Sequence, residues 1–116
     1  MQKNILLSQL TSHLGNPCNK SKTWWAWKDA NDKNQSNLVM LDKKTKSHNV
    51  VRVKVNKKEF HNLVSFIDSI GFSWREDNIK SNFFSRVKVS VPNNPSQNNL
   101  YAVIALIEFS KYQSNP

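Results

Sequence analysis

The sequence predicts an α+β domain: a small, mostly antiparallel sheet of about four strands, with about three helices packed largely on one face. Two segments alternate valine with a basic residue, which is typical of a strand with one buried and one solvated face. Three other segments repeat apolar residues at helical spacing. The length of 116 residues suits one compact domain, without a linker or a second domain.

The predicted elements run in the order helix, three strands, helix, strand, helix. The first helix carries leucines at helical spacing, and Gly15 with Pro17 ends it. The second helix ends at Gly71 for the same reason. The predicted helices cover residues 2–14, 60–70 and 99–112, and the predicted strands cover residues 23–28, 38–41, 49–55 and 84–91.

Polar residues predict where two helices begin. Asn56, followed three residues later by Glu59, resembles a capping pair ahead of the second helix. Asn94 resembles an N-cap for the third helix, with Pro95 at the first helical position. Residues 72–81 have a mixed composition, and we expect a loop or short turn there.

One tetrapeptide occurs twice: Arg-Val-Lys-Val stands at residues 52–55 and again at 86–89. The repeat indicates either a duplicated strand–helix unit or a common strand pattern that arose twice. Both interpretations have the same consequence for the surface. If helices cover the valine face, both strands turn Arg and Lys toward the other face.

Positive charge is concentrated in the middle of the chain. The net charge is +9, and residues 38–58 hold seven bases and one acid. Such a cluster favours a polyanionic partner, although charge of this size also serves solubility. The predicted phosphate contacts are Lys43, Lys44 and Lys46 at a hairpin tip, and Arg52, Lys54, Arg86 and Lys88 across the sheet.

Three tryptophans lie close together before the basic cluster. On a strand, Trp25 and Trp27 point to one side, while Trp24 and Ala26 point to the other. An exposed Trp24 or Trp25 would stack on unpaired nucleobases or anchor a protein partner. Alternatively, the tryptophans enlarge a small core.

The sequence lacks the residues that several kinds of binding and catalytic site need. Three histidines and one cysteine form no zinc-binding pattern, and two glycines are too few for a phosphate-binding loop. We therefore expect no metal, no cofactor and no enzymatic activity. A metal-independent ribonuclease using His61, Arg86 and Lys88 is the least improbable activity. The chain lacks an apolar run long enough for a membrane span, and its single cysteine fits a reducing, cytoplasmic compartment.

These observations lead to one main hypothesis and one rival. The main hypothesis is a non-enzymatic nucleic-acid-binding domain with weak sequence specificity, in which DNA and RNA are not distinguished. The rival is a small basic interaction module or inhibitor that binds an acidic or nucleic-acid-binding surface of another protein. In the rival, tryptophan supplies the binding energy and the bases steer association.

Overall fold

The computed structural model describes residues 2–77 and 79–113. In this part of the chain it contains three α-helices, one short 3₁₀ helix and five strands. In chain order they are α1 (Gln2–Leu14), β1 (Trp24–Lys28), β2 (Asn37–Asp42), β3 (His48–Asn56), η1 (Lys57–Glu59), α2 (Phe60–Ser69), β4 (Ser73–Asp77), β5 (Phe84–Pro92) and α3 (Gln97–Gln113).

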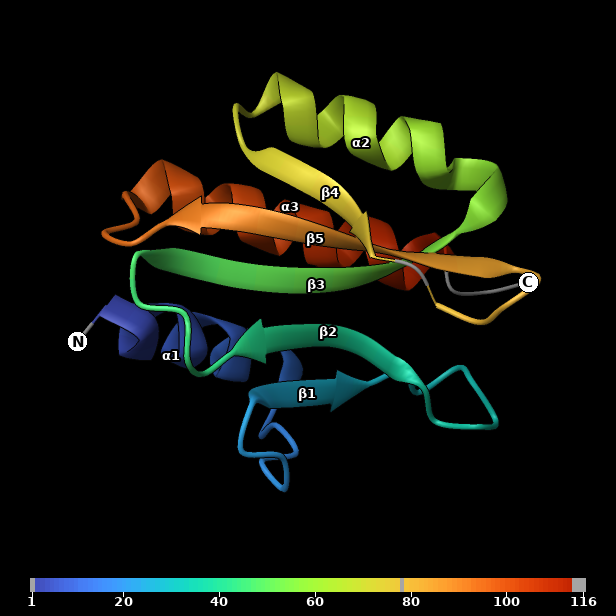
Figure 1. Cartoon of the computed structure of the whole chain (residues 1–116), viewed down its shortest axis with the longest axis horizontal. Helices are drawn as coiled ribbons and strands as arrows, with labels where there is room; N and C mark the ends of the chain where they lie inside the picture. Colours follow the sequence, from blue (N-terminus) through green and yellow to red (C-terminus); the bar gives the residue numbers. More distant parts are fainter. Residues whose placement is uncertain (1, 78, 114–116) are drawn as a thin grey trace.

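The strands form one antiparallel sheet in the order β1-β2-β3-β5-β4 (Figure 1). The two longest strands, β3 and β5, pair at the centre over nine residues each. Their pairing sets the two Arg-Val-Lys-Val copies directly opposite each other, with Val53 facing Val87 and Arg52 facing Lys88. The predicted fold class is confirmed, with five strands in place of about four.

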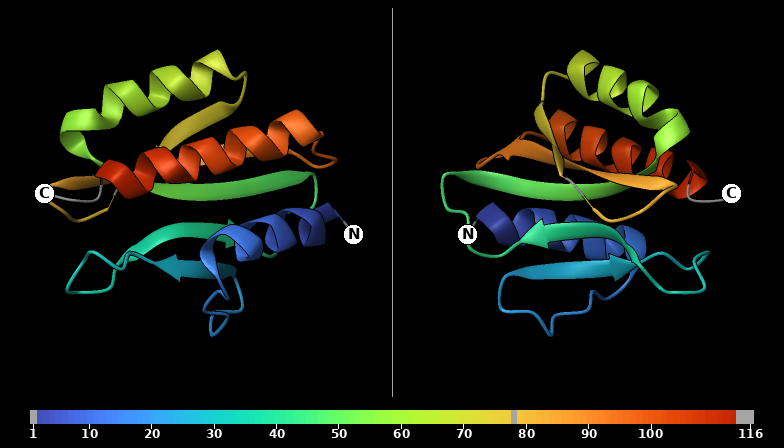
Figure 2. Two further views of the ribbon diagram at one scale, coloured as in Figure 1. Left: turned by 180° about the vertical axis from the view of Figure 1, so that it is seen from behind. Right: turned by 45° about the vertical axis from the view of Figure 1, so that its right-hand side comes forward.

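All three helices lie on the same side of the sheet (Figure 2). The valines of the two repeated segments point toward this side and are buried. Leu6 and Leu10 of α1, Ile67 of α2 and Ile107 of α3 complete the core beneath them. The helices cover one face of the sheet only. The other face carries charged and polar side chains together with Ala26, Met40 and Val50, which are buried there.

The sequence prediction missed β4. Residues 72–81 were expected to form a loop or short turn, but Ser73–Asp77 is a strand that pairs with β5. Its sequence gives little sign of this, because Trp74 is its only large apolar residue. Trp74 turns toward the helices and donates a hydrogen bond from Nε1 to Asp68 Oδ1 on α2 at 2.8 Å. Pairing with β5 and contact with α2 therefore decide its conformation.

The helix starts also differ in detail from the prediction. Asn56 Oδ1 accepts a hydrogen bond from the Lys58 backbone N–H at 3.0 Å, but this cap begins η1, and α2 follows it. At α3 the capping residue is Ser96, not Asn94. Ser96 Oγ accepts from the Asn99 N–H at 3.1 Å, and Asn99 Oδ1 accepts from the Ser96 N–H at 2.9 Å.

The segment between α1 and β1 runs along the outer side of β1. Cys18 exchanges two backbone hydrogen bonds with Ala26, at 2.7 and 3.0 Å. Gly15 has a φ of +90° where α1 ends, a conformation that suits glycine, and its carbonyl accepts a bond from Trp27 Nε1 at 2.9 Å. Among the described residues, none of the helices has both the length and the apolar character needed to cross a membrane.

Candidate functional site

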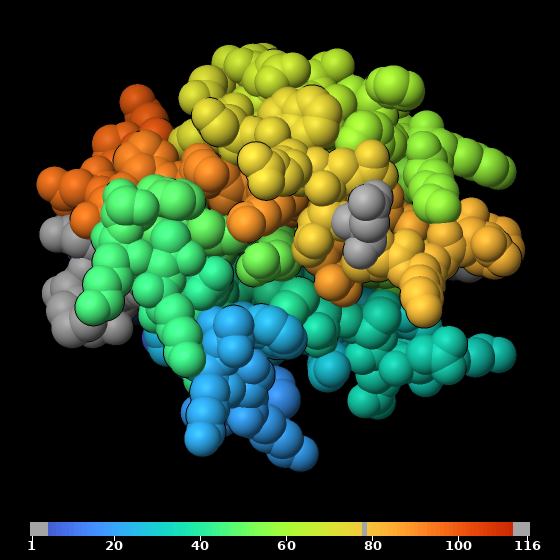
Figure 3. Space-filling model, viewed as in Figure 1, coloured from blue at the N-terminus to red at the C-terminus, as the bar shows by residue number. Residues whose placement is uncertain are grey.

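The face of the sheet away from the helices, here called the open face, is the candidate site (Figure 3). Strand pairing identifies its residues, because directly paired residues point to the same side. Arg52 of β3 is opposite Lys88 of β5, and Lys88 is opposite Arg75 of β4. Lys54 is opposite Arg86, which is opposite Asp77. As predicted, both repeated segments direct Arg and Lys away from the helices.

Three cations form a row across the strands of this face: Arg52, Lys88 and Arg75, here called the cationic row. Side chains at directly opposed positions have Cβ atoms about 5 Å apart, and like charges there destabilise a sheet. Among the described residues, neither Lys88 nor Arg75 forms an ion pair. The fold thus accepts unbalanced positive charge on β5 and β4.

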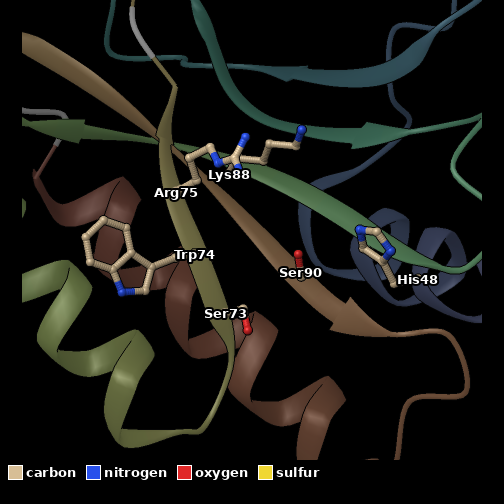
Figure 4. A pocket seen from close by; sticks show the side chains of 6 residues that line it. All are labelled: His48, Ser73, Trp74, Arg75, Lys88 and Ser90. Carbon is tan, nitrogen blue, oxygen red and sulfur yellow. The ribbon is translucent and has the colours of Figure 1, made fainter.

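A hollow of about 250 Å³ lies beside the cationic row. Its lining residues are His48, Ser73, Trp74, Arg75, Lys88 and Ser90. In Figure 4 the Arg75 and Lys88 side chains lie close together, with Ser73 and Ser90 further along the strands and His48 on β3. Guanidinium, ammonium and hydroxyl groups all donate hydrogen bonds to phosphate oxygens. The hollow therefore has the chemistry of an anion site.

Carboxylates compensate part of the neighbouring charge. Arg52 Nε donates to Asp77 Oδ2 at 3.2 Å, and its Nη1 lies 3.9 Å from Asp42 Oδ2. Burial lowers the pKa of the Arg86 guanidinium below its usual value; Asp77 opposes this shift, and the Arg52 charge adds to it. Arg52 and Arg86 thus share Asp77, and Asp42 adds a second carboxylate beside Arg52. Within the cationic row, the positive charge without an ion pair to a described residue is that of Lys88 and Arg75.

The surroundings of Asp42 favour the ionised form of its carboxyl group. Burial alone would raise its pKa, but hydrogen bonds from the Lys44 backbone N–H and the Thr45 hydroxyl, with the charge of Arg52, hold the pKa below its usual value. Asp42 thereby fixes the start of the loop after β2. The loop positions its lysines relative to the open face.

Lys54 has entirely different surroundings from Lys88. It is 4% exposed, and its Nζ donates to Asp29 Oδ2 at 3.0 Å, to Asp32 Oδ2 at 3.2 Å and to Ser36 Oγ at 2.7 Å. The centroid of the Phe84 ring lies 4.0 Å from the same nitrogen. The β1–β2 loop covers this lysine and neutralises it. We therefore leave Lys54 out of the interface, although the sequence placed it among the phosphate contacts.

The predicted hairpin lysines divide into two groups. Lys44 and Lys46 are exposed in the loop after β2. Lys43 instead donates from Nζ to the Ser21 carbonyl at 2.8 Å, and the same nitrogen lies 5.1 Å from the centroid of the Trp25 ring. Lys43 therefore ties two loops together, while Lys44 and Lys46 remain accessible to a partner.

The tryptophan run contributes mainly to packing. Trp27 is 4% exposed, and Trp25 packs against the hydrophobic core beneath the Lys43 amine. Trp24 is paired with Asp42 and so belongs to the open face, where it is half-buried. Of the two tryptophans predicted to stack, only Trp24 lies on the same face as the cationic row.

Sequence reasoning missed Arg75, Ser73 and Ser90. Their roles became visible only when β4 was seen to pair with β5, because this pairing brings Arg75 against Lys88. The sequence carries only a weak sign of this strand. Trp74 and Phe72 alternate with polar residues, and Trp74 stands next to an arginine.

The described residues contain no group of three or more His, Cys, Asp or Glu side chains placed to hold a metal ion. Comparisons of the chain with protein-family models, curated proteins and solved structures found no match.

Proposed function

We propose that the protein is a non-enzymatic nucleic-acid-binding domain that contacts the phosphate backbone with its open face. The cationic row carries this proposal, because Lys88 and Arg75 are directly opposed and no described carboxylate forms an ion pair with either. Two opposed like charges weaken a sheet. A bound polyanion would offset this repulsion by its attraction to both cations.

The surroundings of the row support a polyanion over a single small anion. Arg86 lies on one side of it and Lys44 and Lys46 are exposed in the loop after β2, so positive charge extends beyond the hollow. Phosphate contacts of this kind carry no sequence information. We therefore expect weak sequence specificity and an affinity that falls steeply with salt.

The test is fluorescence anisotropy of the purified protein with single- and double-stranded DNA and RNA, from about 50 to about 200 mM salt. We expect binding to at least one of these ligands, with a steep salt dependence. Lys88→Ala should weaken binding and reduce the slope of log affinity against log salt by about 0.7–0.9, the contribution of one phosphate contact.

A matched control distinguishes binding by the open face from an effect of the protein's net charge. Lys111 lies on α3, in the helix layer, and Lys111→Ala removes the same unit of charge. It should change the slope less than Lys88→Ala does. Equal effects of the two variants would show that net charge, and not the open face, drives binding.

The rival function, binding to an acidic surface of another protein, gives a different result. If the protein binds none of the four ligands even at the lowest salt concentration, the nucleic-acid proposal is overturned. The same protein would then serve as bait for acidic partners, with binding expected to survive high salt and to be lost on Trp24→Ala.

A further inference from the structure

An exposed aromatic ring lies at the end of the open face that is away from the hollow. Phe83, just before β5, is 72% exposed. The β1–β2 loop and the β4–β5 connection lie side by side at this end of the sheet (Figures 1 and 3). Between them is a cavity of about 550 Å³, lined on one side by Phe83 and Phe84; we call it the aromatic cleft.

The backbone holds Phe83 in this exposed position. Its carbonyl accepts a hydrogen bond from the Lys57 N–H at 2.9 Å, and its own N–H donates to Ser81 Oγ at 3.2 Å. Lys57 Nζ also donates to the Ser81 carbonyl at 2.6 Å. A backbone segment that is already fixed in place loses little conformational entropy when a ligand stacks on its side chain.

Polar groups suited to a nucleotide surround the ring. Asn31, Asn34 and Asn56 line the cleft, and an amide can both donate to and accept from the edge of a base. Lys33 and Lys58 line it as well and provide charges for phosphates. The carboxylate of Asp32 also lines the cleft and accepts hydrogen bonds from Ser36 and Lys54. The buried Lys54 network described above fixes the β1–β2 loop, which forms the wall opposite Phe83.

The aromatic cleft extends along β5 toward the cationic row. A second cavity, of about 420 Å³, lies along the same two phenylalanines and is lined by Arg86 and Lys80. Arg86 is two residues from Lys88 on β5. Lys88 lies four positions after Phe84, a separation of about 13 Å along an extended strand. One short segment of nucleic acid could therefore contact the row and the cleft together.

We infer that the preferred ligand is a single-stranded nucleic acid, one unpaired nucleobase of which stacks on Phe83 in the aromatic cleft. This inference rests on the proposed function and names the ligand class for the same face. Single strands can turn a base outward onto an aromatic side chain, whereas bases within a duplex are stacked on each other.

The experiment compares anisotropy titrations of wild type, Phe83→Ala and Phe83→Tyr against three probes: a single-stranded oligonucleotide, its duplex, and a strand of equal length with abasic sites. Phe83→Ala should weaken binding of the single strand by about tenfold and leave its salt slope unchanged. Phe83→Tyr keeps the ring and should bind as wild type does. The abasic strand should bind equally to all three proteins.

Tyr101→Ala is the matched control, since Tyr101 is a 61% exposed aromatic residue on α3. It should leave every affinity unchanged, and thermal unfolding verifies that each variant is folded. Unchanged single-strand affinity in Phe83→Ala, or an equal loss for single strand and duplex, would overturn the inference while leaving phosphate binding intact. Absence of binding by the wild type to all probes would overturn the proposed function as well.

Discussion

Two stretches of this chain have the same residues, Arg-Val-Lys-Val, and their lysines have opposite surroundings. Lys54 is buried in a network with two aspartates and a serine, whereas Lys88 faces two other cations and forms no ion pair with a described residue. The valines of the two copies behave alike and enter the core. Local sequence thus determines the strand and its buried face, while distant loops determine whether a charge is neutralised.

The difference assigns different roles to the two lysines. Lys54 holds the β1–β2 loop against the sheet, because its amine joins β3 to Asp29, Asp32 and Ser36 of that loop. Lys88 holds nothing together in the described structure and is free to meet an anion. The first lysine serves stability, and the second serves the proposed function at some cost in stability.

The largest effect should come from removing the buried lysine. Lys54→Met leaves Asp29, which is 1% exposed, without its counter-charge. Removing one partner of a buried ion pair costs about 3–5 kcal/mol, so we expect a loss of about 3 kcal/mol in the free energy of unfolding, measured by urea denaturation. Adding Asp29→Asn should recover part of this loss. A loss below about 1 kcal/mol would contradict a neutralising role for the pair.

Protonation of Asp32 in acid should weaken the same network by a smaller amount, because Asp32 is one of the two carboxylates that Lys54 contacts. The pKa of Asp32 lies well below its usual 3.8, chiefly because the Ser36 hydroxyl and then the Asn34 N–H donate to the carboxylate, with Lys54 contributing less. A lowered pKa in the folded state gives stability that is present above the unfolded pKa and lost as pH falls toward the folded value.

Urea unfolding at a series of pH values below about 4 measures this effect. Wild type should lose stability over this range, and Asp32→Asn, which is less stable at neutral pH, should lose less. Parallel pH profiles for the two proteins would show that Asp32 does not contribute to acid sensitivity.

The smallest expected effect is a gain in stability, opposite in sign to the losses above. Lys88→Met relieves the repulsion from Arg52 and Arg75, which are directly opposed to it on the neighbouring strands. Cross-strand pairs contribute about 0.2–1 kcal/mol, so we expect a gain of that size in the free energy of unfolding. Urea denaturation of Lys88→Met and of Lys54→Met allows a direct comparison, since lysine is replaced by methionine in both variants. A loss of stability would mean that Lys88 has a structural role.

The same contrast explains how much the sequence could predict. Alternation in residues 49–55 and 84–91 was enough to place two strands and their buried faces, because one face of a sheet must meet the core. It could not show that Lys54 is covered, because the covering residues lie 22 and 25 positions earlier in a loop. Only the folded β1–β2 loop brings Asp29 and Asp32 to that lysine.

Two parts of the site were beyond prediction for related reasons. Strand β4 is defined by its partner, since Ser73–Asp77 has a single large apolar residue and would suit a turn equally well. Arg75 was therefore not recognised as a member of the basic face. Phe83 was overlooked because its exposure depends on backbone hydrogen bonds from Lys57 and to Ser81, which no local pattern encodes.

The backbone pairing of Cys18 with Ala26 limits how this protein can associate with other chains. Unpaired strand edges invite further strands, and with them aggregation. Here the outer side of β1 is partly occupied by the chain's own residues, and β4 at the opposite end is five residues long and carries Arg75, Glu76 and Asp77. Neither end of the sheet favours its extension by a second molecule. This agrees with the proposed binding mode, in which the ligand lies across the strands on the open face.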